Sequence, residues 1–158
     1  MQKALIFVVA AGIVIGLAWP SGRSTAPVAS AVSASRDDQP RETVLERSEG
    51  GHFYANVEVN GELVRFLIDT GASGVALTER DAERIGLDFR RGDYEQVGVG
   101  ASGPVRGKFV TLDKVSLDGK TARDVDGAIL EGSDMSLLGQ NYLGRFSVEM
   151  RGDTMRIY

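Results

Sequence analysis

One carboxylate in the middle of the chain stands where it could do chemistry. Asp69 directly follows the apolar segment Phe66–Ile68 and precedes Thr70 and Gly71. Because glycine lets the backbone turn sharply, a strand over the apolar segment could present the Asp69 carboxylate to a cleft. Asp and Gly also favour ordinary turns, so the triplet taken alone is weak evidence for a catalytic site.

A second segment further along the chain strengthens this interpretation. Leu137 and Leu138 are followed by Gly139, and a short helix is expected over 140–143. The chain therefore has two apolar segments that each end in a glycine turn, in a fixed order.

The two segments together resemble those of the retropepsin-like aspartic proteases, the family that includes the retroviral proteases and their bacterial relatives. In that family an apolar run leads into Asp-Thr/Ser-Gly-Ala, which residues 69–72 match, and a later apolar-Gly-Arg-Asn/Asp-apolar-apolar stretch is matched by 138–143. The resemblance extends from about Gly51 to the C-terminus.

The resemblance implies a role for each matched residue. Asp69 would be the catalytic residue, and Thr70, Gly71 and Ala72 would support its loop. The second loop would pack behind the first; its matched residues are Leu138, Gly139 and Asn141.

Two positions depart from the family pattern. Gln140 stands where the family usually has Arg, and Ser73 stands where an acidic residue often follows Asp-Thr-Gly-Ala. Retroviral members form an ion pair between these positions. Both positions are neutral here, so we expect that pair to be absent without leaving a charge unpaired.

One Asp-Thr-Gly triplet supplies half of the chemistry. An aspartic protease needs two carboxylates about 3 Å apart that share one proton. The ionised oxygen accepts a proton from a water that attacks the peptide carbonyl, while the protonated carboxyl donates a hydrogen bond to the carbonyl oxygen. The second carboxylate must then come from the Asp69 of a second copy, which predicts a two-fold homodimer. The resemblance implies that Thr70 donates across the two-fold axis, and Gly71 would let backbone N–H groups approach the carboxylates.

The residue after the triplet predicts the pH dependence of such a dyad. Ala72 has no hydroxyl group that could donate a hydrogen bond to the ionised pair. We therefore expect a mildly acidic pH optimum, closer to the retroviral than to the gastric enzymes.

A glycine-rich segment is our candidate for a flap over the cleft, and its residues are Gly100, Ala101, Ser102 and Gly103. A mobile hairpin could cover an extended substrate and give it backbone partners. An ordinary surface hairpin is the alternative.

The rest of the folded part is predicted to be all-β, as a closed retropepsin-like barrel that acts as a two-fold homodimer. Hairpin turns are expected at 60–61 and 118–119, because Asn-Gly and Asp-Gly favour the backbone of tight turns. Short strands at this spacing suggest a closed or partly closed barrel. One short helix is expected over 79–85 behind the N-cap Thr78, in addition to the one over 140–143.

The N-terminus has a different composition. Residues 1–20 hold an uncharged segment behind Lys3, typical of an export signal or a membrane anchor, and we favour an uncleaved anchor. Residues 21–48 are rich in Ser, Ala, Pro and charges, which predicts a disordered tether. The folded domain would then occupy 49–158. With Lys3 on the cytoplasmic side, a single-pass protein of the inner membrane would hold this domain in the periplasm.

Length and composition set outer limits. The 158 residues allow one domain of ordinary size, and an apolar content of 42% is enough for a core. A net charge of −4 gives no reason to expect nucleic acid as a partner. The chain has no cysteine, and we expect no cofactor and no metal.

The sequence thus predicts a membrane-tethered, homodimeric aspartic endopeptidase that cleaves extended protein or peptide substrates. The alternative is an anchored peptide-binding domain without catalysis, in which the same barrel carries Asp69 as a structural turn residue.

Overall fold

The computed structural model describes residues 39–100 and 102–158. The elements within these ranges, in chain order, are β1 (Thr43–Glu46), β2 (Tyr54–Val59), β3 (Glu62–Ile68), β4 (Val75–Thr78), α1 (Glu79–Arg84), the 3₁₀ helix η1 (Arg91–Asp93), β5 (Glu95–Gly100), β6 (Gly103–Leu117), β7 (Lys120–Leu130), β8 (Ser136–Leu138), α2 (Gln140–Leu143), β9 (Val148–Arg151) and β10 (Thr154–Ile157).

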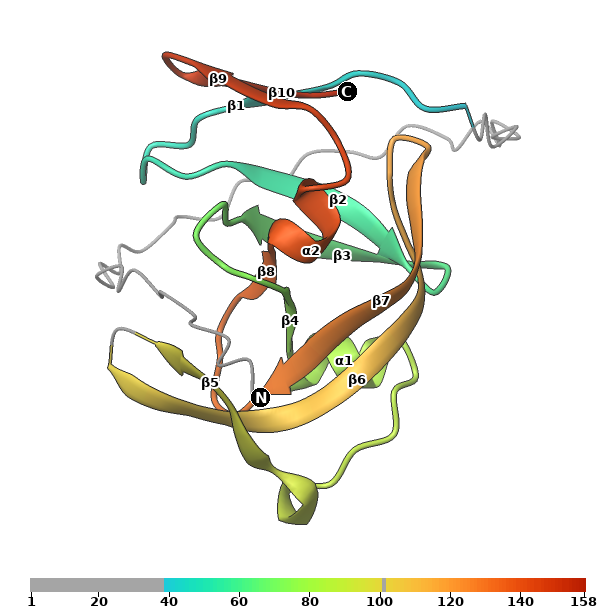
Figure 1. The fold of residues 1–158 in the computed structure, drawn as a ribbon, viewed down its shortest axis with the longest axis vertical. Coiled ribbons are helices and arrows are strands. Elements are labelled where there is room, and N and C mark those ends of the chain that lie inside the picture. Colours follow the sequence, from blue (N-terminus) through green and yellow to red (C-terminus); the bar gives the residue numbers. More distant parts are fainter. Residues whose placement is uncertain (1–38, 101) are drawn as a thin grey trace, which may run out of the picture.

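Six of the strands close into a barrel, as the sequence predicted. The large sheet has the order β2-β3-β8-β4-β7-β6-β5, and β2 also pairs with β6 through Glu58–Ser116 and Val59–Val115. The pairing of β2 with β6 closes the first six strands of this order into a ring and leaves β5 outside it. Figure 1 shows the long β6–β7 hairpin crossing in front of β4 and α1. A closed ring leaves few unpaired strand edges within the barrel.

Two tight turns determine which strands form hairpins. Asn60 and Gly61 have φ angles of 51° and 97°, and Asp118 and Gly119 have φ angles of 49° and 78°. Positive φ at both central residues gives a turn whose twist matches that of paired strands. The predicted hairpins β2–β3 and β6–β7 are therefore confirmed.

The barrel interior forms the main hydrophobic core. Its fully buried side chains come from almost every strand and from α2, and the largest include Phe66, Leu77, Leu112, Ile129 and Tyr142. A smaller second cluster consists of Ala76, Val97, Ala128, Leu130 and Leu137. Because side chains alternate between the two faces of a strand, Ala76 and Leu137 turn to the second cluster while Leu77 and Leu138 turn to the first.

The C-terminal part of the expected tether belongs to the fold, which corrects the predicted boundary at residue 48. Strand β1 pairs antiparallel with β10, and β10 pairs with β9 in a separate three-stranded sheet. Thr43 is buried; its hydroxyl donates to Asp118 at 2.6 Å and accepts a hydrogen bond from Lys120 Nζ at 2.8 Å. Strand pairing and these buried polar contacts order the segment despite its low apolar content.

The remainder of the expected tether, 21–38, and the expected anchor, 1–20, lie outside the described residues. Within 39–100 and 102–158, no helix is long and apolar enough to cross a membrane. The anchor and the periplasmic location therefore stay predictions.

Candidate active site

Asp69 lies at the end of an interior barrel strand. Strand β3 runs between β2 and β8, and its last pair with β8 joins Ile68 to Leu138. The backbone N–H of Asp69 donates to the carbonyl oxygen of Leu138 at 3.1 Å. Both segments singled out in the sequence therefore meet at the point where β3 ends.

The Asp69 carboxylate is held by its own loop. Oδ1 accepts hydrogen bonds from the backbone N–H groups of Gly71 at 2.9 Å and Ala72 at 3.2 Å. A Cβ at position 71 would lie 3.3 Å from Oδ1, so glycine allows this close approach. Backbone donors that point at an ionised carboxylate form stronger hydrogen bonds than neutral pairs and fix its orientation. The predicted approach of backbone N–H groups near Gly71 is thus observed within one copy.

The second loop packs directly behind the first. Gln140 N donates to the Ala72 carbonyl at 2.8 Å, and Asn141 N donates to the Ser73 carbonyl at 3.1 Å. Gly139 lies so close to Gly74 and Ala72 that a side chain would overlap their carbonyl oxygens. Gly139, Gln140 and Asn141 therefore contact the loop that carries Asp69.

Gln140 has a role that the sequence did not reveal. Its Nε2 donates to the carbonyl oxygen of Thr70 at 2.9 Å. A neutral amide thus joins the two loops at the position where the family usually has Arg. The sequence pattern identifies position 140 only as one half of the ion pair found in retroviral members. It therefore could not predict a hydrogen bond from the Gln140 side chain to the Thr70 backbone.

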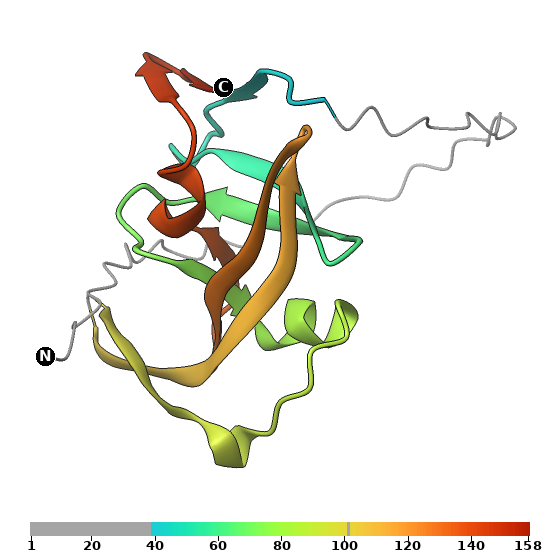
Figure 2. The same ribbon diagram turned by 45° about the vertical axis from the view of Figure 1, so that its right-hand side comes forward.

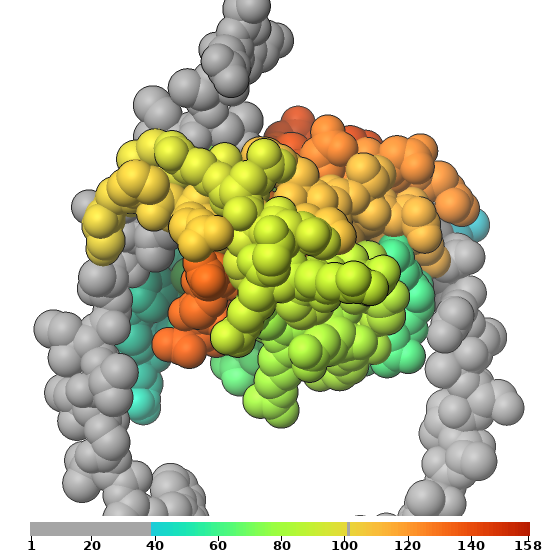
Figure 3. Space-filling view, turned by 90° about the horizontal axis from the view of Figure 1, so that it is seen from below, coloured from blue at the N-terminus to red at the C-terminus, as the bar shows by residue number. Residues whose placement is uncertain are grey.

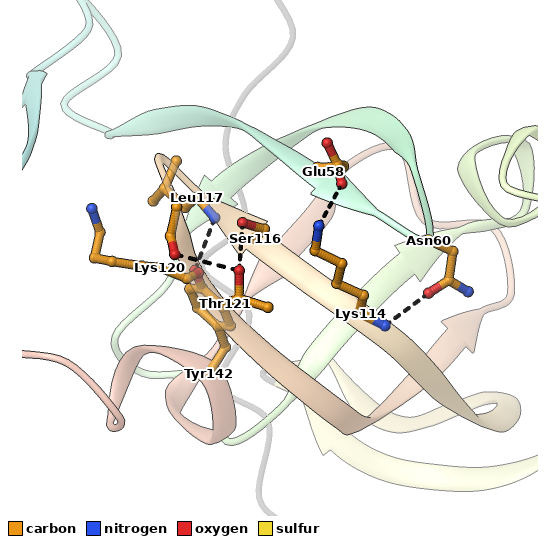
Figure 4. A network of polar contacts seen from close by, with 9 residues as sticks. Glu58, Asn60, Lys114, Ser116, Leu117, Lys120, Thr121 and Tyr142 are labelled. Carbon is orange, nitrogen blue, oxygen red and sulfur yellow. Dashed lines mark hydrogen bonds and ion pairs between the residues drawn. The ribbon is translucent and has the colours of Figure 1, made fainter. Parts of the chain in front are cut away.

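Helix α2 is itself anchored by a buried phenol. Tyr142 donates from its hydroxyl to the Lys120 carbonyl at 2.5 Å and accepts from Leu117 N at 3.1 Å (Figure 4). Burial raises the pKa of Tyr142 above its ordinary value, so the phenol stays protonated as a donor. The β6–β7 turn thereby fixes the helix that carries the second loop. Figure 4 also shows Lys114 joined to Glu58 and Asn60 where β6 meets β2.

The candidate flap is a two-stranded hairpin. Strands β5 and β6 pair up to Gly100 and Gly103, and Gly103 has a φ of 113°, which favours glycine. Ala101 lies outside the described residues and Ser102 is exposed. In both ribbon views the hairpin tip and the loop after β3 lie on the same side of the molecule (Figures 1 and 2). The space-filling view shows the yellow hairpin arching outward on one side (Figure 3).

The second hydrophobic cluster links this hairpin to the strands around Asp69. Val97 of β5 packs with Ala76 of β4 and Leu137 of β8, and Leu67 and Val105 lie against the same cluster. Leu67 is two residues from Asp69, and Val105 is two residues from the hairpin residue Gly103. An apolar wall therefore connects the base of the hairpin to the carboxylate loop.

Comparisons with known proteins agree with this geometry. Residues 55–145 match the family model described as "gag-polyprotein putative aspartyl protease". An uncharacterised protein of Rickettsia prowazekii is 37% identical over 106 residues, which is 66% of this chain and 46% of that protein. An uncharacterised protein of a Sinorhizobium species is 34% identical over 120 residues, which is 74% of this chain and 52% of that protein. The chain spans about half the length of these relatives.

A solved structure adds support at the level of the fold. The crystal structure of a retropepsin-like aspartic protease from Rickettsia conorii is 32% identical, with a TM-score of 0.62. The match covers 74% of this chain and 89% of that one. With the family match spanning the barrel and both loops, the chain belongs to the retropepsin-like aspartic proteases.

Proposed function

We propose that the protein is an aspartic endopeptidase in which Asp69 of two copies activates a water molecule to hydrolyse a peptide bond. The observation that carries this proposal is the Asp69 carboxylate, held by the N–H groups of Gly71 and Ala72 at the end of β3. A structural turn residue would need no second loop built against it. Here Gly139, Gln140 and Asn141 all contact the loop that carries Asp69.

The chemistry requires that one carboxylate be ionised and the other protonated. Two carboxylates about 3 Å apart share a proton, because both cannot ionise at neutral pH. Oδ1 of Asp69 already accepts two backbone hydrogen bonds within its own copy. This leaves Oδ2 to face the partner's carboxylate and the water.

A second copy supplies the missing half of the site. The sequence has one Asp-Thr-Gly triplet, and the Thr70 side chain is exposed beside Asp69. A two-fold axis at this loop would bring both Asp69 residues together and let each Thr70 reach the other loop. The site is incomplete without the partner copy.

The substrate would be an extended peptide. The β5–β6 hairpin lies on the same side as the carboxylate loop, and the apolar wall between them offers side-chain contacts. Strand-like peptides gain backbone hydrogen bonds along their length, and a hairpin that closes over them excludes water. We assign Gly100–Gly103 the role of this flap.

Membrane attachment belongs to the same proposal. An anchor over residues 1–20 would hold the domain at the periplasmic face of the inner membrane. Confining both copies to one membrane raises their effective concentration, so a weak dimer could still assemble there.

The decisive experiment tests Asp69 and the dimer together. The wild-type 39–158 chain should cleave a peptide library, and Asp69→Asn should abolish cleavage, whereas Asp113→Asn, an exposed carboxylate on β6, should leave it unchanged. An excess of Asp69→Asn chain mixed with wild type should suppress cleavage by forming mixed dimers. A statine-type transition-state mimic should inhibit the wild type.

The contrary results are equally clear. Cleavage that persists in Asp69→Asn would refute the catalytic assignment. Activity per molecule that stays constant on dilution, with a monomeric species in sedimentation, would refute the shared site. Binding of peptides without any cleavage, at concentrations where sedimentation shows a dimer, would favour the non-catalytic alternative.

A further inference from the structure

A pocket of about 170 Å³ opens beside the active-site loop. Its walls include Ser73, Val75, Phe109, Asp126, Ala128 and Asn141. A neighbouring hollow of about 480 Å³ shares Phe109 and Asp126. These two side chains therefore stand where the two spaces meet.

The pocket lies within reach of a substrate bound at Asp69. Ser73 is four residues after Asp69, and a chain of four residues spans at most about 14 Å. An extended peptide advances about 3.3 Å per residue. Four residues of an extended substrate therefore cover about the longest separation that Asp69 and Ser73 can have. Phe109 belongs to β6, the same strand that begins at the hairpin residue Gly103.

Phe109 and Asp126 are diagonal neighbours on one face of the β6–β7 pair. The register joins Phe109 to Ala128 and Thr111 to Asp126, and residues two apart on a strand share a face. Phe109 is 52% exposed, which is unusual for so large an apolar side chain next to a pocket. The exposed ring and the carboxylate thus form one surface.

The Asp126 carboxylate has no direct ion-pair partner in the described part of the chain. The Asp126 carbonyl oxygen accepts from Asn141 Nδ2, which fixes its backbone to α2. Ser73 Oγ and Asn141 Oδ1 are buried nearby without a hydrogen-bond partner in the described structure. The pocket is therefore rich in acceptors and has no cation in its wall.

An aromatic ring beside a carboxylate suits a cationic side chain. The aliphatic stem of Lys or Arg packs on apolar surface while its charged end stays at the rim. The cation interacts favourably with the ring face, and the carboxylate accepts its N–H donors. A neutral apolar side chain of the substrate would pack on the Phe109 ring but would give the Asp126 carboxylate no hydrogen-bond donor.

We propose that Asp126 is a specificity-determining residue, which together with Phe109 selects a Lys or Arg side chain of the substrate within about four residues of the cleaved bond. This inference rests on the proposed function, because it assumes that a peptide lies across Asp69.

The experiment compares peptide libraries rather than total activity. Wild-type chain should cleave peptides with Lys or Arg at one position near the cleaved bond roughly 1.5- to fivefold better than matched peptides with Gln, the range of an exposed ion pair. Asp126→Asn should remove this preference, and Asp126→Lys should reverse it toward Glu. Asp113→Asn, on the same strand pair, should keep the wild-type preference.

A binding measurement separates failure of this inference from failure of the proposed function. In the Asp69→Asn background, a fluorescent peptide with Arg should bind more tightly than its Glu counterpart, and Asp126→Lys should invert that order. A wild type that cleaves in an Asp69-dependent way, with a preference unaffected by Asp126→Lys, would overturn the assignment of Asp126 and leave the protease intact. An order of binding that Asp126→Lys leaves unchanged would overturn it even if no peptide were cleaved.

Discussion

The side chain of Gln140 donates a hydrogen bond to the backbone carbonyl of Thr70, 2.9 Å away, and so joins the second loop to the Asp-Thr-Gly turn. Two backbone hydrogen bonds run alongside it, from Gln140 N to Ala72 and from Asn141 N to Ser73. The loop that orients Asp69 is therefore held from behind at three points, Thr70, Ala72 and Ser73.

Removing the Gln140 amide should loosen this loop. We expect Gln140→Leu, which keeps the volume and loses the donor, to lower the free energy of unfolding by about 1 kcal/mol. Cleavage should fall by roughly tenfold or more, because small displacements of a catalytic group are costly. Gln140→Arg restores a donor and should retain most activity. Urea denaturation and kcat/KM measure the two effects, and equal activity of the Leu and wild-type chains would contradict this role.

Gly139 offers a sharper test of the packing between the loops. A methyl group there would overlap the carbonyl oxygen of Gly74 and come within 2.7 Å of the Ala72 carbonyl oxygen. We expect Gly139→Ala to destabilise the fold by roughly 2–4 kcal/mol, because backbone cannot yield as a flexible side chain does. Gly92→Ala is the matched control, since its added methyl would meet nothing within 4 Å. Thermal unfolding of both variants compares them; a similar loss in each would refute the steric argument.

Local sequence rules accounted for much of the fold and for the centre of the site. The turns at Asn60-Gly61 and Asp118-Gly119 were predictable, because each demands positive φ at residues that tolerate it. The N-cap at Thr78 was predictable too, and its hydroxyl accepts from Asp81 N at 3.0 Å. The position of Asp69 followed from an apolar run that ends in an acidic residue and a glycine.

Contacts between distant segments were harder to predict. Strand β1 pairs with β10 at the opposite end of the described chain, and its residues Thr43–Glu46 show no long apolar run. Lys120 is almost fully buried because the β1 segment covers it, and nothing in its own neighbourhood indicated this. Strands β6 and β7 also continue through polar stretches of the sequence, because pairing with each other satisfies their backbones there.

The boundary of the folded domain follows from β1. We expect a chain that begins at Glu49 to melt roughly 5–15 °C below one that begins at Gln39, because it loses the β10 partner and the cover over Lys120. In the longer chain, Lys120 Nζ donates to the Thr43 hydroxyl and to the Arg41 carbonyl. Lys120→Met should therefore lower the melting temperature of the longer chain and lower that of the shorter chain much less. Calorimetry measures the melting temperatures of both lengths, each as wild type and as Lys120→Met. Equal melting temperatures of the two wild-type lengths would mean that β1 contributes nothing.

A surface cluster gives a pH-dependent contribution to stability. Hydrogen bonds from Arg91 and then from Tyr94 lower the pKa of Glu79 below its ordinary value of 4.5. Burial and the bond to Glu79 raise the pKa of Tyr94 to about 12, so its phenol remains a donor at neutral pH. Because the folded state holds the Glu79 proton less tightly than the unfolded chain, the stabilisation is present above pH 4.5 and is lost as pH falls through the lowered value.

The expected result is a difference in the free energy of unfolding between wild type and Glu79→Gln that becomes smaller at acidic pH. Glu79→Gln should be less stable than wild type at pH 7, and this difference in the free energy of unfolding should be smaller at pH 3. Glu83→Gln on the same helix is the control and should show no such trend. Urea denaturation at both pH values measures this, and a wild-type advantage that is the same at pH 3 and pH 7 would rule out the linkage.

The phenol of Tyr142 should matter for both stability and catalysis. Tyr142→Phe would leave the Leu117 N–H and the Lys120 carbonyl without their buried partner, at a cost of about 1–3 kcal/mol. The ring volume is kept, so the loss reflects hydrogen bonding alone. Because α2 carries Gln140 and Asn141, a shift of this helix should also reduce cleavage. Tyr158→Phe, at an exposed terminal position, should leave both quantities unchanged. If Tyr142→Phe unfolded at the wild-type urea concentration, the β6–β7 turn would not be what holds the second loop in place.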